Sequence, residues 1–225
     1  EGKLIDTNKM YTALLDDLHP IKQFGEGPYE LARVYRGWHS KVEHFVKFGT
    51  LDFKTGKKSG EPLVDIFKGV KDKDGFTAYA MSKRAIEKQA QGIETGIDLT
   101  SAKDVVKVNN VKFDEAFKRF VSFQDRVMAY AKDSGVLSTE SFNRIKELSK
   151  DYVPFHRIQE VDPLTGATGA RGLFKSMKGA ETKIVDPLTT SFQNMAAIIK
   201  AAENNRVKLE LVNSPMAKEL LAKPK

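Results

Sequence analysis

The sequence contains no cysteine, a single tryptophan and no long apolar run. Without cysteine there can be no disulfide and no thiolate zinc site, which fits a protein that folds in a reducing compartment or must survive passage between compartments. The longest uncharged stretch, Pro187–Ile199, is too short and too polar to cross a bilayer, which needs about 20 apolar residues. The N-terminal residues Glu1–Leu4 include neither an initiator methionine nor a signal pattern, so we expect a soluble segment of a longer protein.

The composition is that of an ordinary globular protein, with 40% hydrophobic and 30% charged residues in a chain of 225. The net charge is +7, of which +3 lies from Asp151 onward and +4 in the first 150 residues. Because this charge is spread along the chain, it favours a mildly basic solvated surface over a dedicated nucleic-acid face.

Apolar residues recur at spacings of four and three in three long segments, the pattern of one buried helix face. The first predicted helix carries Leu31 to Phe45 and stops at Gly49, and the second covers residues 114–133. The third begins at Asp186-Pro187, where a capping residue is followed by proline at the first helical position. Shorter helices are predicted for residues 8–18, 61–67, 76–91, 102–106 and 138–148.

These elements predict a mainly α fold with minimal β structure, the only strand signal being a short hairpin around residues 51–57. We expect a multi-helix, bundle-like body over residues 1–150. An extended arm and a mobile, basic, glycine-rich loop should follow over 151–185, and a long C-terminal helix with its tail over 186–225. The three parts could also form one domain.

The sequence offers few candidates for chemistry. His39 and Glu43 lie on one helix face, but His44 points away from them, and the pattern of a zinc hydrolase is absent. Glu94 and Asp98 flank Gly96, where a helix stop explains them better than acid–base catalysis does. We therefore predict no catalytic, cofactor-binding or metal site and no small-molecule substrate, so that the chain is not an enzyme.

The loop over residues 159–184 repeats glycine at 166, 169 and 172 among lysines and arginines. Backbone amides there could approach a phosphate, but a phosphate-binding loop would need a lysine running directly into a helix. The pattern indicates a flexible basic loop, with non-specific DNA contact as the alternative function. The residues that would make this contact are Arg157, Arg171, Lys175, Lys178 and Lys183.

The final helix carries a regular apolar stripe that needs a partner surface. It could dock on its own body or reach a neighbouring subunit, and both remain open. The predicted protein-contact residues are Leu188, Phe192, Met195, Ile199 and Leu209.

Five short motifs along the chain carry a resemblance to a known family. They are Asp17–Lys22 (DLHPIK), Gly92–Ile97 (GIETGI), Asp133–Ser138 (DSGVLS), Tyr152–Arg157 (YVPFHR) and Lys178–Leu188 (KGAETKIVDPL). Over nearly the whole chain, the sequence resembles a helical region of very large polyvalent proteins of bacteriophages and other mobile elements. Gly179-Ala180 departs from this family, which has Gly-Ser there.

The resemblance implies a segment of a giant phage protein that is packaged in the virion and delivered with DNA, as internal virion and DNA-ejection proteins are. Its location would be the virion interior and, after delivery, the host cell. Its partners would be other copies of itself or other virion proteins, with incidental DNA binding. The family supplies no catalytic residue that could be transferred to this chain.

Overall fold

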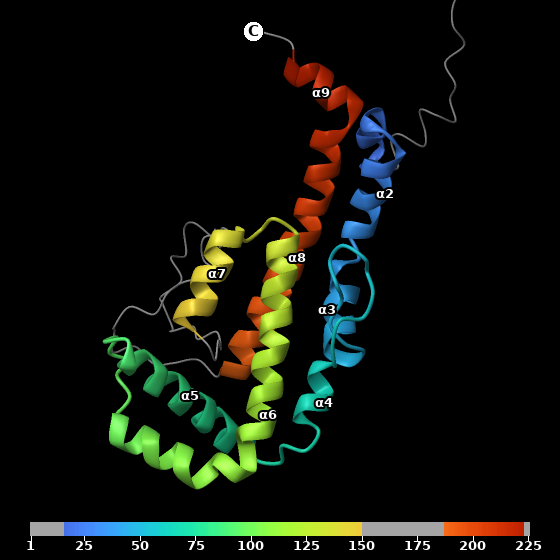
Figure 1. Ribbon diagram of the computed structural model, residues 1–225. Coiled ribbons are helices and arrows are strands. Elements are labelled where there is room, and N and C mark those ends of the chain that lie inside the picture. The colour runs from blue at the N-terminus through green and yellow to red at the C-terminus, as the bar shows by residue number, and fades with distance from the viewer. Residues whose placement is uncertain (1–15, 150–186, 223–225) are drawn as a thin grey trace, which may run out of the picture.

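The computed structural model describes residues 16–149 and 187–222, and it confirms the predicted mainly α fold (Figure 1). The described helices are η1 (His19–Phe24), α2 (Glu26–Tyr35), α3 (Trp38–Lys47), α4 (Leu63–Phe67), α5 (Lys73–Ala90), α6 (Leu99–Asp133), α7 (Thr139–Leu148), α8 (Pro187–Asn213) and α9 (Pro215–Ala222). Within these two ranges the predicted hairpin is reduced to one isolated antiparallel bridge, between Leu51 and Lys58.

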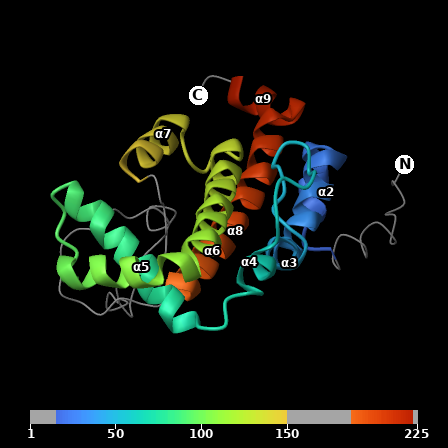
Figure 2. The ribbon, with the colours of Figure 1, turned by 60° about the horizontal axis from the view of Figure 1, so that its bottom comes forward.

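The two longest helices, α6 and α8, lie side by side and run in the same direction (Figure 1). Helices α2 and α3 flank α8 on one side, and α7 packs against α6 on the other (Figure 2). The first part of α6 is turned away from α8 and pairs with α5, so α6 is visibly bent in both views. Asn109 donates to the carbonyl of Val105 within α6, a side-chain bond of the kind that bends helices.

One continuous core joins α3, α4, α5, α6 and α8. Aromatic rings of α4, α5 and α6 meet edge to face, as Phe76 does with Phe67, Phe113 and Phe120 at 5.2, 5.8 and 6.1 Å. The same core contains the fully buried Met195 and Ile199 of α8. The body and the C-terminal helix therefore share one hydrophobic interior. No helix in the described ranges is long and apolar enough to span a membrane.

Two predicted helix boundaries were wrong. The segment from Leu31 to Phe45 is not one helix, because α2 ends before Arg36-Gly37 and α3 begins at Trp38. Glycine is a poor helix former, and the Gly37 N–H bonds the carbonyl of Val34, closing a turn there. Conversely, the helices predicted at 102–106 and 114–133 are one 35-residue helix, α6, since tertiary packing against α5 carries the helix through the polar stretch between them.

The start of α7 agrees with an expected capping residue, whereas the cap of α6 was not predicted. Ser138 accepts the N–H of Ser141 at the start of α7, and Asp98 accepts that of Ser101 at the start of α6. Residues 91–98 form the predicted interruption, in which Gly92 and Gly96 have positive φ angles. The predicted helix at 8–18 lies almost wholly outside the described residues. The arm and loop predicted at 151–185 lie entirely outside them.

Candidate functional site on helix α8

Helix α8 is held in the core by one apolar face. The side chains of Met195, Ile198, Ile199 and Ala202 are fully buried there, and the helix packs against α2, α3, α5 and α6. Burial of these four apolar side chains stabilises the packing of α8 on the body, at roughly 0.8 kcal/mol per buried methylene. The part of α8 from Met195 to Ala202 therefore belongs to the protein's own interior.

A buried carboxylate lies just beyond this apolar face. Glu203 is only 2% exposed, and it accepts hydrogen bonds from the Tyr130 hydroxyl of α6 and the Lys41 ammonium of α3. The guanidinium of Arg206, one turn further along α8, lies 3.6 Å from the same carboxylate. We call these four side chains the Glu203 junction. It joins three helices through one negative charge, which burial would otherwise make costly.

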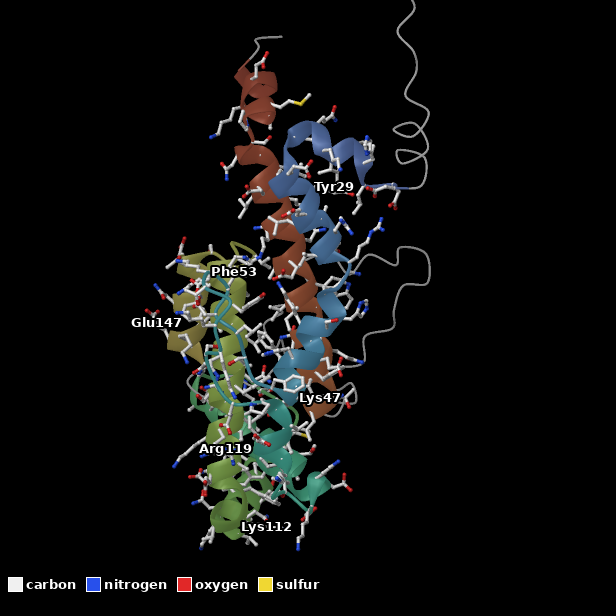
Figure 3. All side chains as sticks on the ribbon, turned by 90° about the vertical axis from the view of Figure 1, so that its right-hand side faces the viewer. Tyr29, Lys47, Phe53, Lys112, Arg119 and Glu147 are labelled. Atoms are coloured by element: carbon white, nitrogen blue, oxygen red, sulfur yellow. The ribbon has the colours of Figure 1, made fainter. Side chains whose placement is uncertain are left out.

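The loop over residues 50–60 is tied to this junction. Arg206 donates to the carbonyl oxygen of Phe53 at 2.7 Å, and its guanidinium lies 3.8 Å from the centre of the Phe53 ring. The Phe53 ring in turn meets Tyr130 edge to face at 5.1 Å. Figure 3 labels Phe53 where the loop lies against the upper end of α6. The loop therefore packs over the contact between α6 and α8.

Burial raises the pKa of the Tyr130 hydroxyl above its ordinary value of 10, and the hydrogen bond to Glu203 raises it further. The unfolded chain loses this proton near pH 10, whereas the folded chain keeps it. Stability from this group is therefore complete below pH 10 and is lost as pH rises towards the folded pKa. Denaturation curves should show up to about 1.4 kcal/mol lost per pH unit above 10.

Tyr130→Phe is the control for this pH dependence, because it removes the proton but keeps the ring. Its curve above pH 10 should be flatter than that of the native sequence by the same slope. Equal slopes in the two proteins would contradict the account of Tyr130.

Helix α8 also carries a regular seam of residues spaced by four, three, four and three: Ile198, Ala202, Asn205, Leu209 and Val212. We call this the α8 seam. Asn205 donates to the carbonyl oxygen of Ser134 at 2.6 Å, immediately after α6 ends at Asp133. Beyond that point α8 continues past the end of α6 (Figure 1), and Leu209 and Val212 are 47% and 55% exposed. The seam is therefore covered in its first half and open in its second.

The five predicted protein-contact residues fall into different environments. Met195 and Ile199 are core residues, and Leu188 is partly buried against the core. Phe192 and Leu209 are 44% and 47% exposed. Only Leu209 lies on the open part of the α8 seam. The predicted DNA-contact residues Arg157, Arg171, Lys175, Lys178 and Lys183 lie outside the described residues.

Of the other candidates from the sequence, Glu43, His44 and Asp98 have local bonding partners, and Glu94 is exposed. Glu43 pairs with Lys47 on the exposed face of α3 at 2.7 Å, and the His44 ring nitrogen lies 2.9 Å from the carbonyl oxygen of Gly49. His39 stacks on its neighbour Trp38. Asp98 is the capping residue of α6, and the hydrogen bonds of that role lower its pKa. The described residues hold no group of three or more potential metal-ligating side chains.

Sequence reasoning missed Val212 and the members of the Glu203 junction other than Arg206, which was noted only as a polar residue within the stripe. The spacing that continues from Ile198 to Val212 could have indicated the seam. No local pattern marks Glu203, since Lys41 and Tyr130 lie 162 and 73 residues away from it in the chain.

Comparison with known proteins adds no relative. No protein-family model, no curated protein and no solved structure matches this chain. The functional argument therefore rests on the α8 seam and the Glu203 junction, together with the motif resemblance described above.

Proposed function

We propose that this chain is a non-enzymatic assembly segment of a large phage protein, and that the open end of the α8 seam binds other copies of the chain or other virion proteins. The observation that carries the proposal is the exposure of Leu209 and Val212 beyond the end of α6. Their positions continue a seam whose first half is buried, so a further helix could pack on them as the body packs on Ile198 and Ala202.

Exposed apolar side chains are common and mean little when they are isolated. Val108 and Val111 of α6 are 79% and 101% exposed, and they too are three residues apart. Neither lies on the buried stripe of α6, which runs through Phe113, Phe117 and Phe120. The feature that sets Leu209 and Val212 apart is therefore their alignment with an interior seam, rather than their exposure.

The phage context of the proposal rests on the order of the short motifs. A segment of this kind would be packed in the virion interior and would enter the host with the DNA. Association through an apolar helix seam should be insensitive to salt, because its contacts involve no exposed charges. Binding of a phosphate backbone would instead weaken steeply as salt rises.

The assembly surface is tested by Leu209→Glu with Val212→Glu, compared with Val108→Glu with Val111→Glu as the matched control. Light scattering over a concentration series should show association of the native sequence and of the control pair, and little or none for the seam pair. Association should persist at high salt. A native chain that stays monomeric throughout, or two variants that behave alike, would exclude the seam as the assembly surface.

The context is tested by mass spectrometry of purified phage particles before and after triggered DNA release. Peptides of this chain should be present before release and depleted after it. Absence of the chain from intact particles would overturn the virion role and place the protein in the infected cell.

A further inference from the structure

The groove that receives α8 is a binding site for a helix. It is formed by helices α2, α3, α5 and α6 of the body, residues 16–149, and buried side chains of the body such as Phe45, Val127 and Tyr130 belong to the same core cluster as Met195 and Ile199 of α8. Without α8 this groove would expose a continuous apolar surface, which soluble proteins rarely tolerate. The fit between groove and helix is thus established by the packing itself.

Polar contacts fix the position of α8 along the groove. Lys41 and Tyr130 bind Glu203, Ser134 accepts from Asn205, and Phe53 accepts from Arg206. These contacts reach α8 from α3, α6, the turn after α6 and the 50–60 loop. A helix shifted by one turn would leave Glu203 buried without its partners, so only one register is stable.

The body contacts named above do not depend on which copy of the chain supplies α8. The covalent link between body and helix is the 37 residues from 150 to 186. Fully extended, a link of that length could span at most about 130 Å. The 27-residue α8 is itself about 40 Å long. The link is therefore long enough for α8 to reach the groove of a neighbouring molecule.

We propose that α8 is an exchangeable element, which occupies the groove of its own body in the isolated chain and that of a second copy when chains are concentrated. Exchange preserves the groove contacts and costs mainly the entropy of association. The intramolecular arrangement is favoured until the chain concentration approaches the effective concentration set by the link, of millimolar order. Dense packing would provide that condition.

This inference deepens the proposed function, because it names a second copy of the chain as the partner. It stands or falls separately from the open seam. Exchange uses the buried residues of α8 and the groove, whereas the seam contact uses Leu209 and Val212.

The test is a pair of cysteines, Ser134→Cys with Asn205→Cys, in a chain that has no others. The Asn205 amide nitrogen lies 2.6 Å from the backbone carbonyl oxygen of Ser134, so the two positions are neighbours across the α6–α8 contact, and bonding within the monomer after dilute oxidation shows that the two thiols can meet. The variant is unfolded in reductant, refolded at low and at high concentration, and oxidised. Non-reducing electrophoresis then separates a monomer with an internal bond from a covalent dimer.

We expect internally bonded monomer after dilute refolding and a rising share of dimer after concentrated refolding. Peptide mapping of that dimer should show bonds joining position 134 to position 205. Each single-cysteine variant can join only like positions and is the control for random oxidation. Bonded monomer at every concentration, or dimers that join like positions only, would overturn the inference.

A second test uses charge reversal across the groove. Lys41→Glu and Glu203→Lys each place like charges together within one chain. When the two variants are refolded as a mixture, opposite charges meet only if α8 is exchanged. We expect a heterodimer in native mass spectrometry. The double variant in one chain is the control for tolerance of the reversed pair. A monomeric mixture beside a folded double variant would contradict exchange.

Discussion

Replacing Ile199 with alanine should lower the free energy of unfolding by about 3 kcal/mol, which is a large part of the total stability of an ordinary domain. The Ile199 side chain is fully buried between α8 and the body, so the change leaves a cavity as well as removing apolar contact. Urea denaturation followed by circular dichroism measures this loss directly.

Leu209→Ala is the matched control, since it removes a comparable apolar side chain from the same helix. Leu209 lies on the open part of the α8 seam, so its loss should cost under about 1 kcal/mol in the isolated chain. In light scattering of self-association the order of the two effects should be reversed, so that Leu209→Ala weakens association more than Ile199→Ala does. Equal losses of stability would mean that the open end of the seam is covered in the folded chain.

The sequence was sufficient for elements whose signals are local. Asp186-Pro187 predicted where α8 begins, because a cap and a proline at the first helical position act over a few residues. Ser138 predicted the start of α7 for the same reason. Both signals act on the backbone groups at a helix terminus, so they can be recognised from a few neighbouring residues.

Features set by contacts between distant segments were missed or misplaced. The polar residues around Asn109 broke the apolar pattern, so α6 was predicted as two helices, although α5 holds it together as one. Likewise, the stripe of α8 predicted a helix that needs a partner. The partner of Met195 and Ile199 is the body of the same chain, which only the tertiary structure could reveal.

The division of α8 into a buried and an open half gives the helix two roles. Its first half closes the core, and the Glu203 junction with Asn205 fixes its register there. Because the register is fixed, the direction of the open half of α8 and the distance by which it projects beyond α6 are fixed as well. A change at the junction should therefore affect both stability and the presentation of Leu209 and Val212.

Replacing Glu203 with alanine should cost about 3 kcal/mol, close to the effect of Ile199→Ala but for a different reason. The change leaves the ammonium of Lys41 and the guanidinium of Arg206 facing each other without the carboxylate between them. It also leaves the Tyr130 hydroxyl without its acceptor. Water can solvate the two cations in part, since they retain 27% and 28% exposure, which keeps the cost at the lower end of what a broken buried ion pair causes.

Two further variants separate the contributions to stability. Glu203→Gln separates the charge of this side chain from its shape, and Glu43→Ala compares an exposed ion pair with the buried one. Glu203→Gln keeps the side-chain volume and an acceptor for Tyr130, so it should recover part of the loss in urea denaturation. Glu43→Ala removes the carboxylate of the exposed pair with Lys47 and should leave the unfolding midpoint unchanged. A Glu203→Ala protein as stable as the native chain would mean that apolar packing alone holds α8 in register. The charge-reversal mixture should then give no heterodimer.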